Sequence, residues 1–413
     1  MQSTSWMKFI APMTWLGIVV ALNTNVAASD EHQTSLQSIN PHHFAGCGFL
    51  AIDVLLDKTP VTMWVSTGMQ DNFIDRSLEK VCATATNGGR VPTFTRSDEE
   101  TSTFDSQKFR DVAVVINGQN EQHDLISMDL SGFGFGIVAG PQGTLGMNAL
   151  KSHVLSFRHR GADVDVQLST SVTENTVHDQ RPIRMKLNKN NIPLVSVHFP
   201  ILGSRDMLVN TGQNMSVTVT PVCAGILMRA GEAVFRDSNK TVDGDNFRMM
   251  ETIVIREVEC LGVTFQNVPA QIQSVNSVGM GILRHFDITM DFPHQITYFK
   301  VISEGERRLN GLTRSIDIAF RDPQTVVVIS ESTDLNIKPG DQLLELQGKP
   351  ASAFTYWQIG DILDQTAQPV RCRVQRGETV FDLEWTPKSR FEPPKSWSTR
   401  KALASEFYES LKQ

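Results

Sequence analysis

The feature that most constrains the fold is a sequence pattern that occurs twice, in the same order, along the chain. In the first copy a strand, a turn and a second strand lead into Val65-Ser66-Thr67-Gly68. In the second copy the same succession leads into Val209-Asn210-Thr211-Gly212. About 70 to 80 residues after each copy comes a hydrophobic-glycine pair, Leu145-Gly146 and then Met280-Gly281. Two ordered copies predict a two-lobed β protein made by duplication.

The apolar segments between residues 45 and 390 are mostly short and rich in Val, Ile and Phe, and turn clusters such as Asn117-Gly118 separate them. This pattern is typical of a mainly β fold. Few segments carry apolar residues at helical spacing, the clearest being Tyr356 to Leu363 and a terminal series of Leu403, Phe407 and Leu411.

The repeated pattern resembles the bilobed aspartic peptidases, especially the retropepsin-like proteins of bacteria, over residues 45 to 302. The resemblance implies an acid-protease-like pair of β-barrels, with lobe 1 at 45–160, a linker at 161–180 and lobe 2 at 181–302. In that family the threonines hydrogen-bond across the lobe junction and the glycines permit close approach of the two loops. Thr67, Gly68, Thr211 and Gly212 match these positions.

The chain departs from the family at the two catalytic positions, where Ser66 and Asn210 replace the aspartates. The family's reaction needs two carboxylates that share a proton, one to activate water and one to protonate the developing oxyanion. A serine hydroxyl and an amide do neither near neutral pH, so we expect no catalytic residue here. Ser66 and Asn210 can still hydrogen-bond to each other, and they avoid the burial of two like charges. Met69 and Gln213 stand where the family has a small residue, which is a further departure.

A third region, 313–387, follows a linker at 303–312 and resembles a bacterial PDZ domain. The resemblance rests on Ile337-Lys338-Pro339-Gly340-Asp341, the strand after it, Gln347-Gly348-Lys349-Pro350, and the helical segment that begins at Tyr356. Such a domain implies binding of an extended polypeptide by strand addition, independently of the lobes. The peptide-facing residues of its helix are expected to be Ile359, Ile362 and Leu363.

The two ends of the chain differ from the rest. Residues 1–28 have a single charge, Lys8, then a short apolar run and a small-residue exit, which together predict a cleaved signal peptide. A membrane anchor is the alternative, but the apolar run is shorter than a span needs. We therefore expect an exported protein, periplasmic or extracellular, with no membrane span after cleavage. A linker at 29–44 follows the signal peptide, and a tail occupies 388–413.

Charge and metal-ligand patterns exclude several function classes. The net charge of −7 disfavours nucleic-acid binding. His32 and His42-His43 lack the spacing of a closed metal site, and Gly134-x-Gly136 is followed by Gly140-Pro141 rather than a helix, so neither a metal nor a cofactor is expected.

The chain has five cysteines. Local disulfides are permitted between Cys47 and Cys82 and between Cys223 and Cys260, whereas the alternating pattern around Cys372 predicts a buried strand thiol.

These observations lead to two hypotheses of different class. The first is an exported, non-catalytic polypeptide-binding or scaffolding protein, in which the lobe pair either takes part in binding or only supports the PDZ-like module. The second is an active aspartic-type endopeptidase with unusual active-site residues.

Overall fold

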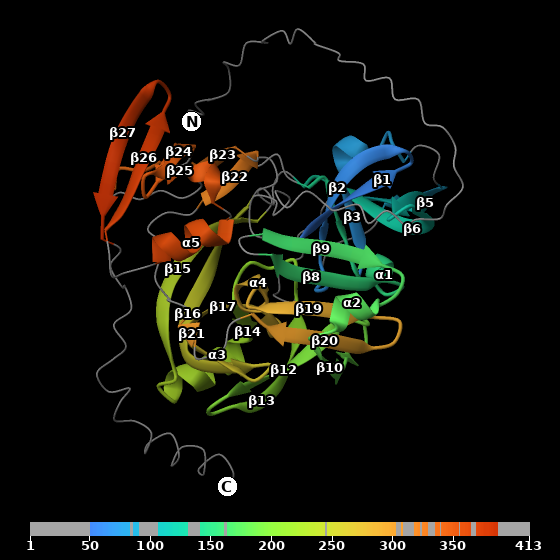
Figure 1. Cartoon of the computed structure of the whole chain (residues 1–413), viewed down its shortest axis with the longest axis horizontal. Coiled ribbons are helices and arrows are strands. Elements are labelled where there is room, and N and C mark those ends of the chain that lie inside the picture. The colour runs from blue at the N-terminus through green and yellow to red at the C-terminus, as the bar shows by residue number, and fades with distance from the viewer. Residues whose placement is uncertain are drawn as a thin grey trace, which may run out of the picture. The chain divides into compact units, whose positions relative to one another are not determined.

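The computed structural model describes residues 50–82, 86–90, 106–130, 141–160, 163–243, 246–302, 307–308, 318–322, 324–328, 335–338, 340–354, 356–364 and 369–386 (Figure 1). The expected signal peptide, the 29–44 linker, the 388–413 tail with its Leu403 series, and the histidines 32, 42 and 43 lie outside these ranges.

Six strands of the first half close into a barrel. The strands of this half are β1 (Ala51–Leu56), β2 (Thr59–Val65), β3 (Asn72–Asp75), β4 (Thr86–Arg90), β5 (Gln107–Ile116), β6 (Gln119–Met128) and β7 (Gly143–Leu145). Their order is β1-β2-β7-β3-β6-β5, with β4 outside β5, and pairing of β1 with β5 closes the barrel. Alternate side chains of a strand point to opposite faces, and this explains which residues of β1 line the barrel interior. Ile52, Val54 and Leu56 are buried, while Asp53 and Leu55 are exposed.

The second half repeats this barrel. Its strands are β11 (Lys186–Leu187), β12 (Pro193–Phe199), β13 (Gly203–Val209), β14 (Val217–Val219), β15 (Ala233–Asp243), β16 (Asn246–Cys260), β17 (Val263–Ile272) and β18 (Ser277–Val278), and the helix α3 spans Pro221–Arg229. The closed order is β12-β13-β18-β14-β17-β16, with β11 and β15 at the ends and β21 (Arg307–Arg308) on β17. The β2–β7 pair and the β13–β18 pair are both parallel, as duplication requires. The prediction of a mainly β, two-lobed fold is confirmed.

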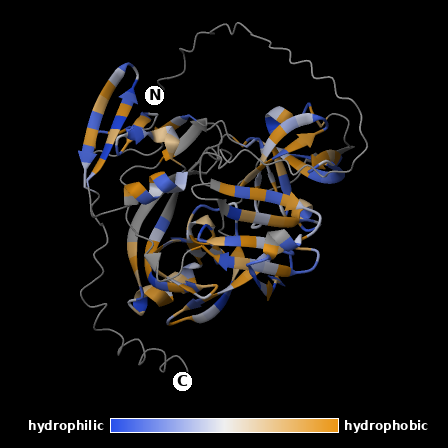
Figure 2. Cartoon of the chain, viewed as in Figure 1, coloured by the Kyte–Doolittle hydropathy of each residue, from blue (hydrophilic) through white to orange (hydrophobic). Residues whose placement is uncertain are grey.

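A third sheet takes strands from both halves. It consists of β8 (Val154–Arg160), β9 (Asp163–Ser169), β10 (Arg181–Arg184), β19 (Phe286–Asp291) and β20 (Ile296–Val301), in the order β10-β20-β19-β8-β9. The antiparallel β19–β8 pair joins the two halves. β9 and the short helix α2 (Glu174–Val177) occupy much of the range expected to be a linker. The alternating burial of Val164, Val166 and Leu168 explains why this segment is a strand, and Figure 2 shows similar hydropathy alternation on other strands.

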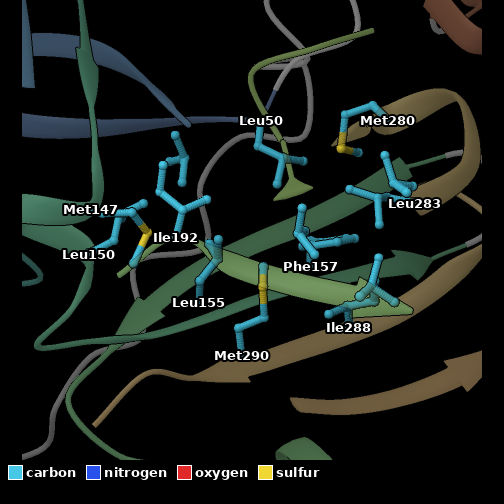
Figure 3. Close-up of a cluster of buried hydrophobic side chains, with 14 of the residues drawn as sticks. Leu50, Met147, Leu150, Leu155, Phe157, Ile192, Met280, Leu283, Ile288 and Met290 are labelled. Carbon is cyan, nitrogen blue, oxygen red and sulfur yellow. The ribbon is translucent and has the colours of Figure 1, made fainter. Parts of the chain in front are cut away.

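The core is continuous across the two halves. Two short helices, α1 (Met147–Leu150) and α4 (Met280–Leu283), follow the last strand of each barrel. Their apolar side chains gather with those of β8 and β19, including Phe157 and Ile288, in one buried cluster (Figure 3). Neither half buries these side chains alone, so the halves are joined by packing as well as by the shared sheet.

The described residues between 318 and 386 form a small α+β unit with its own core. Its strands are β22 (Ile318–Asp322), β23 (Thr325–Val328), β24 (Gln342–Leu346), β25 (Lys349–Pro350), β26 (Val370–Arg376) and β27 (Thr379–Trp385), and the helix α5 spans Tyr356–Asp364. The order is β22-β23-β24-β26-β27, with β25 on β24. α5 lies against β22, which is an edge strand, since no described strand pairs with its outer side. We call this unit the C-terminal module.

The described cysteines are all free thiols: Cys82, Cys223, Cys260 and Cys372. The disulfide that was permitted between Cys223 and Cys260 is therefore not formed, and Cys47 lies outside the described ranges. Burial raises the pKa of the Cys82 thiol to about 11 and that of the Cys260 and Cys372 thiols to about 12, so these thiols stay protonated. Among the described helices none has the length and apolar character to cross a membrane.

Candidate functional site

The candidate site lies where the two Ser/Asn-Thr-Gly loops meet, and two buried threonines fasten it. Thr67 Oγ1 donates to the Val209 carbonyl at 2.6 Å and accepts from Thr211 N–H at 3.2 Å. Thr211 Oγ1 donates to the Val65 carbonyl at 2.6 Å and accepts from Thr67 N–H at 3.1 Å. Each hydroxyl therefore satisfies two backbone groups of the opposite half, and both threonines are fully buried.

The backbone of each loop is held by the strand that precedes the short helix. Ser66 N–H donates to the Leu145 carbonyl and Asn210 N–H donates to the Val278 carbonyl, both at 2.9 Å. Gly146 follows Leu145 and Gly279 follows Val278, and these two glycines are the N-caps of α1 and α4. Gly279, rather than Gly281 of the expected Met280-Gly281 pair, is therefore the counterpart of Gly146.

These two glycines are required by close approach of the backbone. A Cβ at Gly146 would lie 2.2 Å from the Asp71 carbonyl oxygen, and a Cβ at Gly279 would lie 2.3 Å from that of Met215. The first residue of each short helix also donates to the adjacent loop. Met147 N–H donates to the Met69 carbonyl at 2.8 Å, and Met280 N–H donates to the Gln213 carbonyl at 2.7 Å.

Ser66 and Asn210 each pack over the glycine of the opposite lobe. A Cβ at Gly212 would lie 2.3 Å from Ser66 Oγ, and a Cβ at Gly68 would lie 2.3 Å from Asn210 Cγ. The glycines thus make room for the side chains of Ser66 and Asn210. Ser66 is 2 % exposed, and its Oγ has no hydrogen-bond partner among the described residues.

Asn210 is oriented by its own lobe. Its Oδ1 accepts from Gly212 N–H at 3.1 Å, and its Nδ2 donates to Gln213 Oε1 at 3.2 Å. The same Gln213 oxygen accepts from the buried Ser277 hydroxyl at 2.7 Å. The hydrogen bond that Ser66 and Asn210 could form is not present, and the Asn210 amide bonds Gly212 and Gln213 instead.

The described residues at Ser66 and Asn210 do not pair an acid with a base. Asn210 does not titrate, Ser66 has no described base within hydrogen-bond reach, and Gln213 presents an amide oxygen to Asn210.

Comparison of the sequence with models of known protein families, and with curated proteins, finds no match. The described residues also hold no cluster of three or more His, Cys, Asp or Glu side chains suited to a metal ion.

The C-terminal module places its predicted peptide-facing residues in two environments. Ile359 and Leu363 are 0 % and 2 % exposed and belong to the module core, together with Ile318 of β22. Ile362 is half-buried against the same core. In this conformation Ile362 is the member of the three that a ligand could reach.

Asp341 of the Pro-Gly-Asp turn is a structural anchor of the module. Arg376 donates to its two carboxylate oxygens at 2.7 and 2.6 Å, and Lys338 N–H donates to Oδ2 at 2.9 Å. The Asp341 side chain is 2 % exposed, so these bonds replace the water that it loses. The hydrogen bond from Arg376 lowers the pKa of Asp341 below its ordinary value of 3.8.

α5 also contacts the second lobe, which sequence reasoning did not predict. Arg284, the C-cap of α4, donates to both carboxylate oxygens of Asp361 at 2.8 and 3.3 Å, and its guanidinium lies 4.5 Å from the Trp357 ring centroid. Asn214 Nδ2, two residues after Gly212, donates to the Tyr356 hydroxyl at 3.4 Å. The helix is thus fixed beside the loop that carries Asn210.

Sequence signals for these additional residues were weak. Gln213 was singled out only as a departure from the family, and Ser277 belongs to a segment with no marked pattern. Arg284 and Asp361 are 77 residues apart, and nothing local to either residue indicates the partner.

Proposed function

We propose that this chain is a non-catalytic, exported protein that binds or scaffolds polypeptides. The junction carries the proposal, because it keeps the interlocked Thr67 and Thr211 of a two-lobed aspartic-peptidase-like scaffold while Ser66 and Asn210 occupy the positions of the dyad. Absence of positioned general acid-base catalysis costs on the order of 10² to 10⁴ in rate, and both partners are lacking. The retropepsin-like assignment, the export and the absence of proteolysis are all parts of this proposal.

The polypeptide-binding part of the proposal rests on the C-terminal module, taken as a PDZ-like domain. Strand addition needs an edge strand and pockets for side chains beside it. β22 supplies an edge among the described strands, and α5 lies next to it. The ligand proposed for this edge is an extended peptide with a hydrophobic end, bound with an affinity of order micromolar, about −8 kcal/mol.

Proteolysis is tested by incubating the mature protein with a denatured protein substrate from mildly acidic to neutral pH and sequencing new termini by mass spectrometry. We expect no cleavage. Asn210→Asp and Ser66→Asp, singly and together, are the matched variants, because only the double variant has two carboxylates to share a proton. Cleavage by the unmodified chain that disappears in Asn210→Ala would establish the endopeptidase alternative.

Binding is tested on the same full-length protein with a library of C-terminal and internal peptides. We expect retention of hydrophobic-ended peptides and about tenfold weaker binding in Ile362→Lys, since a cation would replace a half-buried apolar contact. Ile362→Val is the control and should bind nearly as well. Absence of retention across the library, both by the unmodified chain and by the Arg284→Ala variant introduced below, would remove the binding half of the proposal.

A further inference from the structure

The nine-residue helix α5 has two contact faces, one toward the module core and one toward the second lobe. One face, formed by Tyr356, Ile359 and Leu363, is part of the module core. Another face carries Trp357 and Asp361, one turn apart, which engage Arg284 of the second lobe. Movement of α5 away from β22 therefore changes both faces at once.

The space between α5 and β22 is closed. Ile318 on β22 is 1 % exposed, and Ile359 and Leu363 on α5 are 0 % and 2 % exposed, all in the same apolar cluster. A ligand side chain enters between strand and helix only if these side chains separate, because packed interiors leave no room for an additional group. Binding by strand addition with side-chain insertion therefore requires displacement of α5.

Three contacts to the second lobe oppose that displacement. They are the bidentate Arg284–Asp361 ion pair, the Arg284–Trp357 cation–π contact and the Asn214–Tyr356 hydrogen bond. Arg284 is only 16 % exposed in its side chain, and Trp357 packs against the core of the lobes as well as against the module core. The lobe thus holds the helix in the position that closes the module.

We propose that the second lobe acts as a latch on the C-terminal module, keeping the β22–α5 groove closed until a polypeptide displaces α5 from Arg284. This inference rests on the proposed function, since it concerns regulation of the same peptide groove. By linkage, contacts that only the closed state makes lower the apparent affinity for peptide, and their removal raises it by the same factor. A partly exposed ion pair and a cation–π contact together correspond to a factor of about 5 to 20.

The test compares the full-length protein with its Arg284→Ala variant, using the peptides retained by the unmodified chain and, if there are none, the whole library again. Peptide affinity is measured by fluorescence anisotropy, and hydrogen exchange of α5 and of residues 210–214 reports undocking. We expect Arg284→Ala to bind about 5- to 20-fold more tightly and to exchange faster in both segments. Arg371→Ala is the matched control, since it removes an exposed ion pair with Glu384 on β27, away from the lobe contacts. It should leave affinity unchanged.

A charge exchange makes the test specific to the contact. Arg284→Asp should bind peptide as tightly as Arg284→Ala, and the double variant Arg284→Asp/Asp361→Arg should restore part of the closed behaviour. Equal peptide affinity in the unmodified chain and in Arg284→Ala, with exchange showing undocking, would overturn the latch while leaving peptide binding intact. Failure of both proteins to bind any peptide would overturn the latch and the proposed binding function together.

Discussion

Thr67 and Thr211 show how single side chains join two lobes. Each is buried, and each hydroxyl serves as donor and acceptor to the backbone of the junction. Their place at a junction was implied by the resemblance of the two Thr-Gly copies to the aspartic peptidases and not by a local signal, since their partners lie 142 to 146 positions away. Orientation of Asn210 by Gln213 and Ser277 was not predictable, since it depends on a residue 64 positions from Gln213.

Thr211→Val is expected to destabilise the protein by about 2 to 4 kcal/mol, because it leaves the buried Thr67 N–H and Val65 carbonyl each without a partner. The change in size is small, so the effect reports hydrogen bonding. Urea unfolding of the full-length protein measures it. Thr264→Val, the same replacement on a half-buried position of β17, should change stability by less than about 1 kcal/mol. A loss at Thr211 no larger than at Thr264 would contradict this role.

At the scale of elements, local patterns predicted the α5 helix close to its observed bounds, the two strands that precede Ser66, and the strand that contains Cys372. These patterns assigned the wrong glycine to the second lobe because Gly279-Met280-Gly281 offers two choices, and it is the position of Gly279 at the N-cap of α4, directly after Val278, that identifies it. They also missed β9, whose polar alternate residues made the segment look like a linker. In both cases the deciding interaction is with a distant part of the chain.

Gly279→Ala is expected to destabilise the protein by about 1 to 3 kcal/mol, since its Cβ would meet the Met215 and Gln213 carbonyl oxygens at 2.3 and 2.7 Å. Gly225→Ala in α3 is the matched control. Nothing lies within 4 Å of its Cβ, so the better helix propensity of alanine should raise stability by about 0.5 to 1 kcal/mol. Opposite signs of the two effects in thermal unfolding check the assignment of Gly279 to the junction.

The turn at Asp341 gives the module a pH dependence. Because the folded-state pKa of Asp341 is lowered, its stabilising effect is present at pH above the ordinary 3.8 and is lost as pH falls through the lower, folded value. Asp341→Asn should destabilise the module by about 2 to 4 kcal/mol at neutral pH, since Arg376 loses its charged partner.

The difference in module stability between Asp341→Asn and the unmodified chain should shrink as pH falls below 3.8, where the native carboxyl also loses its charge. Hydrogen exchange of β24 and β26 in the full-length protein measures the module separately from the lobes. A difference that stays constant to about pH 2.5 would show that the charge of Asp341 is not what stabilises the turn.

At the scale of the whole molecule, the two halves form one folding unit because β8 of the first pairs with β19 of the second, and α1 and α4 share one apolar cluster. A first-lobe fragment, residues 45–160, loses β19 and exposes Leu155 and Phe157. We expect it to unfold without cooperativity or to self-associate, whereas residues 45–308 should unfold in one transition. Calorimetry and light scattering on the two fragments test this expectation, and a monomeric, cooperatively unfolding 45–160 would contradict it.

The crossed packing of Ser66 over Gly212 and Asn210 over Gly68 also bears on how the two halves of the chain can change over time. Positions that contact only their own half are free to diverge after a duplication. At these four positions, a substitution in one half alters which substitutions the other half tolerates. Enlarging residue 212 is costly because Ser66 has a side chain, and it would cost less with glycine at 66. The mutational history of each half is therefore tied to that of its copy at the point where the two meet.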